Sequence, residues 1–127
     1  MTTDPPSLPP PPVRDLDDLR LRLRAFAAAR DWDPFHSPKN LAMALVVEAA
    51  ELVEHFQWLT AEESAALPPA TRDAVADELA DVLVYLVRIA DRLDVDLLAA
   101  VASKMVRNEA KYPAGRVKGS ARKYTEY

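Results

Sequence analysis

The sequence predicts an all-α protein whose helices form an antiparallel four-helix bundle. Apolar residues recur at three- and four-residue spacings through four segments, short links join these segments, and no alternating strand pattern is visible. The chain has 127 residues, of which 50% are hydrophobic and 28% are charged. This length and composition are typical of one globular domain with a packed core.

The first segment, residues 1–12, contains six of the eleven prolines. A run of prolines forms neither a helix nor a sheet ladder, so we expect a disordered, extended arm; a ligand for a proline-binding domain is the alternative. The helical domain is expected over residues 13–113. Its first helix is predicted over residues 15–30, where Leu16, Leu19, Leu23 and Phe26 share one face.

The second helix has a clear start signal. Ser37 is a preferred N-cap and Pro38 is suited to the first helical position. This helix is predicted to continue to about residue 59. Thr60 and Glu63 have the spacing of a capping box, which indicates one short helical turn.

The third helix is predicted over residues 71–93, after a break at Pro68 and Pro69. The fourth is predicted over residues 95–111 and ends before Pro113. Residues 114–127 are expected to form an irregular basic tail. The second and third helices are apolar around most of their circumference, which is typical of helices surrounded by protein. One small bundle has little room for two such helices, so we expect a homo-oligomer.

Composition excludes several classes of function. The net charge of −4 argues against a nucleic-acid polymer as the main partner. The chain has no cysteine, no apolar stretch long enough to span a bilayer and no signal-peptide pattern, so we expect a cytoplasmic protein without a membrane partner. Its two glycines, Gly115 and Gly119, cannot build a glycine-rich phosphate loop. Any phosphate would have to be bound through metal ions and side chains.

Acidic residues interrupt the two apolar helices at matching positions. Glu48 and Glu51 are three residues apart, as are Glu78 and Asp81, so each pair lies on one helix face. Carboxylates among apolar residues are costly unless a positive charge offsets them, and Mg²⁺ prefers such oxygen ligands. A solvated acidic face is the alternative. A carboxylate-bridged iron site is disfavoured, because it needs Glu-x-x-His and His55 follows Glu51 by four residues.

Cationic and aromatic residues supply further candidates. Lys104, Asn108 and Lys111 share one face of the fourth helix, where they could bind phosphate or form an ordinary solvated face. In the tail, Lys118, Arg122 and Lys123 could add to them. Trp32 and Trp58 could stack on a nucleobase, or could instead close the ends of the bundle.

Several segments together resemble a known family. The motif Glu48-x-x-Glu51 followed by Glu78-x-x-Asp81 is similar to that of the MazG-like all-α nucleotide pyrophosphohydrolases, and above all to their dCTP pyrophosphatase branch. Val47 stands where the general family motif has another glutamate. The resemblance extends through residues 30–32, 35–40, 51–58, 81–86, 103–105, 111–113 and 118–125.

The resemblance implies a site and an assembly. It assigns Mg²⁺ to Glu48, Glu51, Glu78 and Asp81, and it implies a dimer or a dimer of dimers. Leu23 stands where relatives carry a histidine beside the base, which weakens the case for strict cytosine selectivity. The base and sugar would lie near Trp32, His36, Asn40, Trp58 and Tyr85, and the phosphates near Lys104, Asn108, Lys111 and Lys123.

The function expected is Mg²⁺-dependent hydrolysis of a nucleoside triphosphate, dCTP or a modified dCTP, to the monophosphate and pyrophosphate. A metal ion would activate the attacking water, and Glu51 or Glu54 would take its proton. Two alternatives stay open. One is a non-catalytic helical oligomerisation or interaction module, and the other is a pyrophosphohydrolase for another nucleotide such as dUTP.

Overall fold

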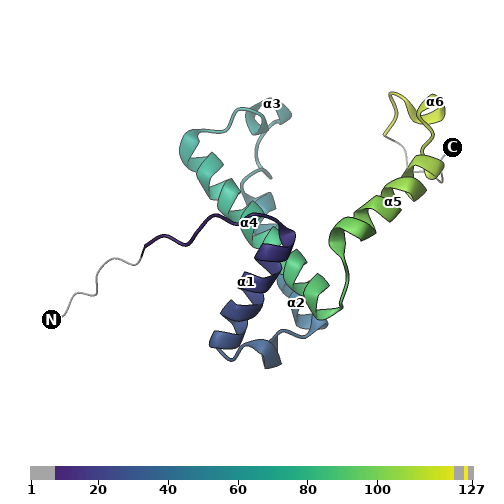
Figure 1. The fold of residues 1–127 in the computed structure, drawn as a ribbon. Helices are drawn as coiled ribbons and strands as arrows, with labels where there is room; N and C mark the ends of the chain where they lie inside the picture. The colour runs from purple at the N-terminus through teal and green to yellow at the C-terminus, as the bar shows by residue number, and fades with distance from the viewer. Residues whose placement is uncertain (1–7, 122–124, 126–127) are drawn as a thin grey trace.

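The computed structural model describes residues 8–121 and residue 125, and it contains helices and no strand within this range. The principal helices are α1 (Leu16–Ala29), α2 (Pro38–Glu54), α4 (Pro69–Arg92) and α5 (Leu97–Lys111) (Figure 1). Short helices accompany them, namely η1 (Asp33–Phe35), α3 (Ala61–Ser64) and α6 (Ala114–Val117). The all-α prediction is therefore confirmed for the described residues.

The predicted start signals form the caps that the sequence indicates. The Ser37 side chain accepts a hydrogen bond from the Asn40 N–H, and α2 begins at Pro38. Thr60 and Glu63 form a reciprocal capping box that opens α3. In both places a side chain satisfies an N–H group that has no partner within the helix.

Helix bounds depart from the prediction at four places. Helix α4 begins at Pro69, two residues earlier than predicted, because proline fits the first helical position. Helix α2 ends at Glu54, not near residue 59, because the N–H groups of His55 and Phe56 bond carbonyls only three residues back and tighten the chain into turns. Helix α5 begins at Leu97, where Asp96 accepts a hydrogen bond from Ala99. The tail predicted to be irregular contains the single helical turn of α6.

The proline-rich arm is only partly described, because residues 1–7 lie outside the described range. Residues 8–14 contain no helix. Arg22 on α1 donates hydrogen bonds to the carbonyls of Pro11 and Pro12, at 2.5 and 2.9 Å. These hydrogen bonds hold the described part of the arm against α1.

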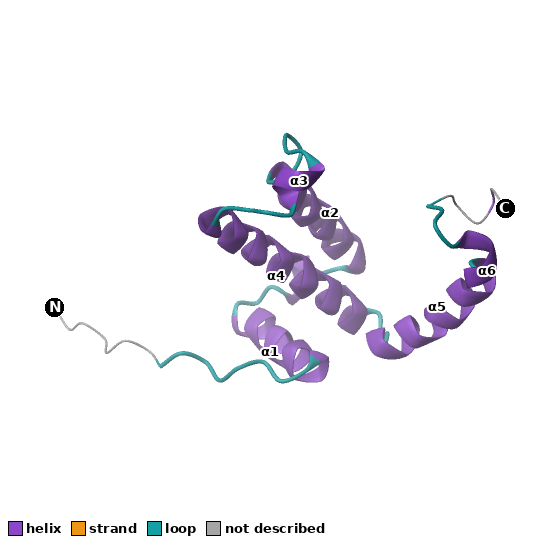
Figure 2. Ribbon diagram, turned by 90° about the horizontal axis from the view of Figure 1, so that it is seen from above, coloured by secondary structure: helices purple, strands orange, loops and turns teal. Residues whose placement is uncertain are grey.

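Helix α4 is the centre of the packed body. It packs most extensively against α2 and also against α1 (Figure 2). The most buried apolar side chains come from these three helices: Ala27, Leu41, Val75, Val87 and Ala90. No helix in the described part of the chain combines the length and apolarity that a membrane span requires.

Helix α5 does not complete a four-helix bundle within one chain. It projects from the end of α4, after a link in which Asp94 adopts a left-handed conformation with φ of 54° (Figures 1 and 2). Its apolar side chains Leu98, Val101, Met105 and Val106 are 51% to 69% exposed. The single chain thus differs from the predicted bundle, because the link directs α5 away from the face that it would cover.

Candidate active site

Four carboxylates from two helices meet between α2 and α4, and we call them the carboxylate cluster. Glu48 and Glu51 come from α2, and Glu78 and Asp81 come from α4. Oxygens of Glu48, Glu78 and Asp81 all lie within 4.8 Å of one another. Glu51 interacts with both Glu48 and Glu78. The three-residue spacing within each pair places the carboxylates on the helix faces that meet.

Among the described residues, no lysine or arginine forms an ion pair with the carboxylate cluster. Burial, the adjacent Glu51 carboxyl, and the charges of Asp81 and Glu78 raise the pKa of Glu48 to about 7. Burial and the neighbouring carboxylates also raise the pKa of Glu78, while His55, 3.9 Å away, partly opposes this effect. One oxygen of Glu48 and one of Glu78 are buried and have no hydrogen-bond partner in the described part of the chain. Like charges held together in this way need a proton or a cation.

A hard divalent cation fits this set of ligands. All of the donor atoms are carboxylate oxygens, which suit Mg²⁺, and the two unpartnered buried oxygens are available to coordinate an ion. Glu48 and Glu78 each have one buried oxygen, whereas Asp81 is exposed, so the cluster is partly buried and open to solvent on the Asp81 side.

A pocket of about 320 Å³ adjoins the carboxylate cluster. Trp32 and His36 contribute to its wall, with ring centroids 6.0 Å apart, and the Trp32 ring meets the edge of Phe26 at 5.7 Å. The volume lies at the lower end of the range for small-molecule sites. Its lining residues are Leu23, Phe26, Ala27, Trp32, His36, Glu48, Asp81, Val84, Tyr85 and Arg88. An aromatic wall facing acidic groups suits a flat ring attached to a metal-bound phosphate chain.

Residues 43–127 match the MazG-like family. The chain belongs to the MazG-like family. It is 50% identical to dCTP pyrophosphatase 1 of Mus musculus and of Homo sapiens, over 91% of this chain and 69% of each relative. It is also similar to the structure of a pyrophosphatase from Archaeoglobus fulgidus, with a TM-score of 0.74 and 39% identity over 77% of this chain and 92% of that one. The predicted enzyme class, a nucleoside triphosphate pyrophosphohydrolase, is confirmed.

Only some of the predicted site residues of this MazG-like chain line the pocket. Trp32, His36 and Tyr85 do so, together with Glu48 and Asp81. Leu23 also lines it, at the position where the resemblance led us to expect a histidine in relatives.

Other predicted residues do not line this pocket. Trp58 is 87% exposed, and Glu54 is exposed at the end of α2. The side-chain amide of Asn40 donates to the Phe35 carbonyl at 3.0 Å, so it fixes the loop before α2. Trp58 lies beyond the end of α2, in the turns that follow Glu54.

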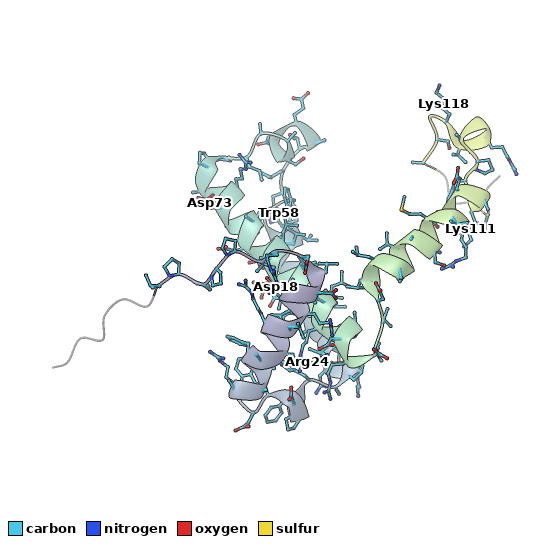
Figure 3. All side chains as sticks on the ribbon, viewed as in Figure 1. Asp18, Arg24, Trp58, Asp73, Lys111 and Lys118 are labelled. Atoms are coloured by element: carbon cyan, nitrogen blue, oxygen red, sulfur yellow. The ribbon has the colours of Figure 1, made fainter. Side chains whose placement is uncertain are left out.

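Three of the four predicted phosphate-binding residues of the MazG-like chain are carried by α5. Lys104, Asn108 and Lys111 are exposed on this helix, and Figure 3 shows Lys111 apart from Trp58 and Arg24. Lys123 lies outside the described residues. Within one chain, the acidic and basic halves of the predicted site are therefore separate.

Sequence reasoning missed a second polar cluster, formed by α4 with α1 and η1, which we call the arginine cluster: Arg24, Arg88, Asp33 and Asp91. Asp91 accepts hydrogen bonds from Arg24 at 2.6 and 3.1 Å and from Arg88 at 3.4 Å. Arg88 is only 4% exposed and also donates to Asp33 at 2.6 Å. The sequence pattern that could have revealed this cluster is the pair Arg88 and Asp91, which are three residues apart in an otherwise apolar part of α4.

Proposed function

We propose that the chain hydrolyses dCTP, or a modified dCTP, to the monophosphate and pyrophosphate in a Mg²⁺-dependent reaction. The observation that carries this proposal is the uncompensated carboxylate cluster beside an aromatic pocket. The two relatives named dCTP pyrophosphatase 1 support the choice of nucleotide.

The metal would be held by Glu48, Glu51, Glu78 and Asp81. When bound, it would supply positive charge against the triphosphate oxygens and would lower the pKa of water. Glu51 is the better candidate for accepting the proton of the attacking water, because it interacts with both Glu48 and Glu78, whereas Glu54 is exposed. Trp32, His36 and Tyr85 would hold the base and sugar against the pocket wall.

The remaining predicted contacts require a second copy of the chain. Helix α5 exposes Leu98, Val101 and Met105, while α2 exposes Met43 and other apolar side chains. Association into a homodimer, or a tetramer of two dimers, would bury these faces. Lys104, Asn108, Lys111 and Lys123, with Trp58 and Asn40, would then complete a site around the pocket of a neighbouring copy.

A pyrophosphohydrolase for a different nucleotide, such as dUTP, is the second candidate. The observation that favours it is Leu23 in the pocket wall. An apolar side chain at this position offers no hydrogen bond with which to distinguish cytosine from uracil.

The test is pyrophosphate release from a panel of deoxy- and ribonucleoside triphosphates. We expect turnover with Mg²⁺ and the highest kcat/KM for dCTP or a 5-substituted dCTP. Replacing Glu51 with Ala should lower turnover at least about 100-fold, with the helical circular dichroism unchanged. Glu62→Ala is the matched control, because Glu62 is exposed on α3.

One outcome would contradict the proposed metal site, and another would change the substrate. A Glu51→Ala variant with wild-type turnover would remove the metal-site proposal. A preference for dUTP over dCTP would leave the chemistry intact and replace the substrate.

A further inference from the structure

Arg88 directs its guanidinium toward three different partners. Nη2 donates to Asp33 at 2.6 Å and Nη1 to Asp91 at 3.4 Å. The remaining edge, Nε–H, donates to Nδ1 of His36 at 3.2 Å. The Arg88 side chain is 5% exposed, and its ion pairs with the buried Asp91 and the more exposed Asp33 fix its orientation.

The direction of the hydrogen bond between Arg88 and His36 determines where the imidazole carries its proton. A guanidinium has only donors and stays charged, so Nδ1 of His36 must be the acceptor. The single proton of the neutral ring is then on Nε2. Burial and the charge of Arg88 lower the pKa of His36, which keeps this ring neutral at pH 7.

His36 also belongs to the pocket wall. Its neighbours there include Trp32, Glu48 and Asp81. Nε2 has no hydrogen-bond partner among the residues that the structure describes. Ionised Glu48 and Asp81 only accept hydrogen bonds, whereas His36 in this tautomer contributes a neutral donor that stays available to a ligand.

We propose that Arg88 is a positioning residue that fixes the Nε2–H tautomer of His36, which then donates a hydrogen bond to an acceptor atom of the bound nucleobase. The hydrogen bond to the base rests on the proposed nucleotide site, whereas the tautomer is a property of the free protein. A ring carbonyl of a pyrimidine is an acceptor of the required kind.

The tautomer can be measured directly by ¹⁵N NMR of the histidine side chains. The chain has two histidines, and the signals lost in His36→Gln identify His36. In the wild type, Nδ1 should give an unprotonated, pyridine-like shift and Nε2 a protonated, pyrrole-like shift. In Arg88→Met, both shifts should move toward the average of the two exchanging tautomers. A protonated Nδ1 in the wild type would overturn the proposal.

The matched control is Arg92→Met. Arg92 also lies on α4 and donates to His36, but its 3.1 Å hydrogen bond goes to the backbone carbonyl and not to the ring. The ring shifts should stay at their wild-type values in this variant. Identical ring shifts in Arg88→Met and Arg92→Met would also overturn the proposal.

Steady-state kinetics test the second part of the proposal, the hydrogen bond from His36 to the nucleobase. Loss of a well-aligned donor should raise KM roughly two- to tenfold in Arg88→Met, with kcat little changed, whereas Arg92→Met should keep the wild-type KM. An unchanged KM in Arg88→Met would overturn the contact with the base.

A replacement variant and a separate readout keep a folding failure, and a failure of the proposed function, distinguishable from a failure of this proposal. If Arg88→Met does not fold, Arg88→Lys replaces it, since lysine keeps the charge but lacks the guanidinium Nε–H. Absence of turnover in the wild type would sink the proposed function, while the ¹⁵N shifts would still decide the tautomer.

Discussion

Helix α4 contributes to two polar clusters that differ in how their charge is balanced. Near its middle, Glu78 and Asp81 join two glutamates of α2 in the carboxylate cluster. Within the described residues, His55 is the one potentially cationic side chain that forms an ion pair with this cluster. Near its end, Asp91 belongs to the arginine cluster. There each carboxylate is paired with at least one guanidinium.

The pKa values of carboxyl groups on this one helix therefore move in opposite directions. Burial and neighbouring carboxylates raise the pKa of Glu78. Hydrogen bonds and charge from Arg24 and Arg20 lower the pKa of Asp91, although burial opposes them. The arginine cluster is complete without a ligand, whereas the carboxylate cluster needs a proton or a cation. On this contrast we interpret the arginine cluster as structural and propose the carboxylate cluster as the functional site.

The largest expected effect comes from Glu48→Gln. Removing this charge should lower turnover at least about 100-fold, because a metal ligand is lost. It should also raise the Tm of the metal-free protein, because an unpaired buried carboxylate is removed. Pyrophosphate release and thermal unfolding in a chelator measure the two effects. A fall in the metal-free Tm would contradict the functional interpretation of the cluster.

The opposite pattern is expected for Asp91→Asn. This change leaves Arg88 and Arg24 without their shared carboxylate, and it should lower the free energy of unfolding by about 3 kcal/mol. Urea denaturation measures the loss. The control is Asp94→Asn, because asparagine tolerates the left-handed conformation found there and Asp94 is exposed. Equal stabilities of the two variants would contradict the structural role of Asp91.

A smaller effect is expected from pH. The pKa of Glu48 lies above the unfolded value of 4.5, so between about pH 4.5 and 7 the unfolded chain binds fewer protons at this group. The metal-free protein should therefore lose stability as pH rises through this range, and the stabilisation by Mg²⁺ should grow. Tm measured with Mg²⁺ or with chelator tests this, and the difference between wild type and Glu48→Gln isolates the group. A difference that does not change with pH would contradict it.

Local signals made much of the fold predictable. Ser37, Pro38 and Thr60 mark helix starts through caps that involve residues only three positions apart, so the sequence contains the whole interaction. The regular spacing of Glu48 with Glu51 and of Glu78 with Asp81 likewise defines a helix face. The contact between these two faces could also be predicted, because both helices are apolar on either side of the carboxylates.

Other features depend on contacts that the sequence does not reveal. The end of α2 carries no glycine or proline near His55, so its turns gave no signal. The hydrogen bond between Arg88 and His36 joins residues 52 positions apart. The direction of α5 depends on the backbone conformation of a four-residue link, residues 93–96, in which Asp94 has a positive φ.

The most direct test of the account is calorimetric titration of Mg²⁺ into the wild type and into Glu78→Gln near pH 7. We predict saturable binding to the wild type with release of protons, because Glu48, whose pKa is about 7, must lose its proton to bind the ion. Binding should be lost or greatly weakened in Glu78→Gln. Equal affinity of both proteins for Mg²⁺ would contradict the claim that the carboxylate cluster is the metal site.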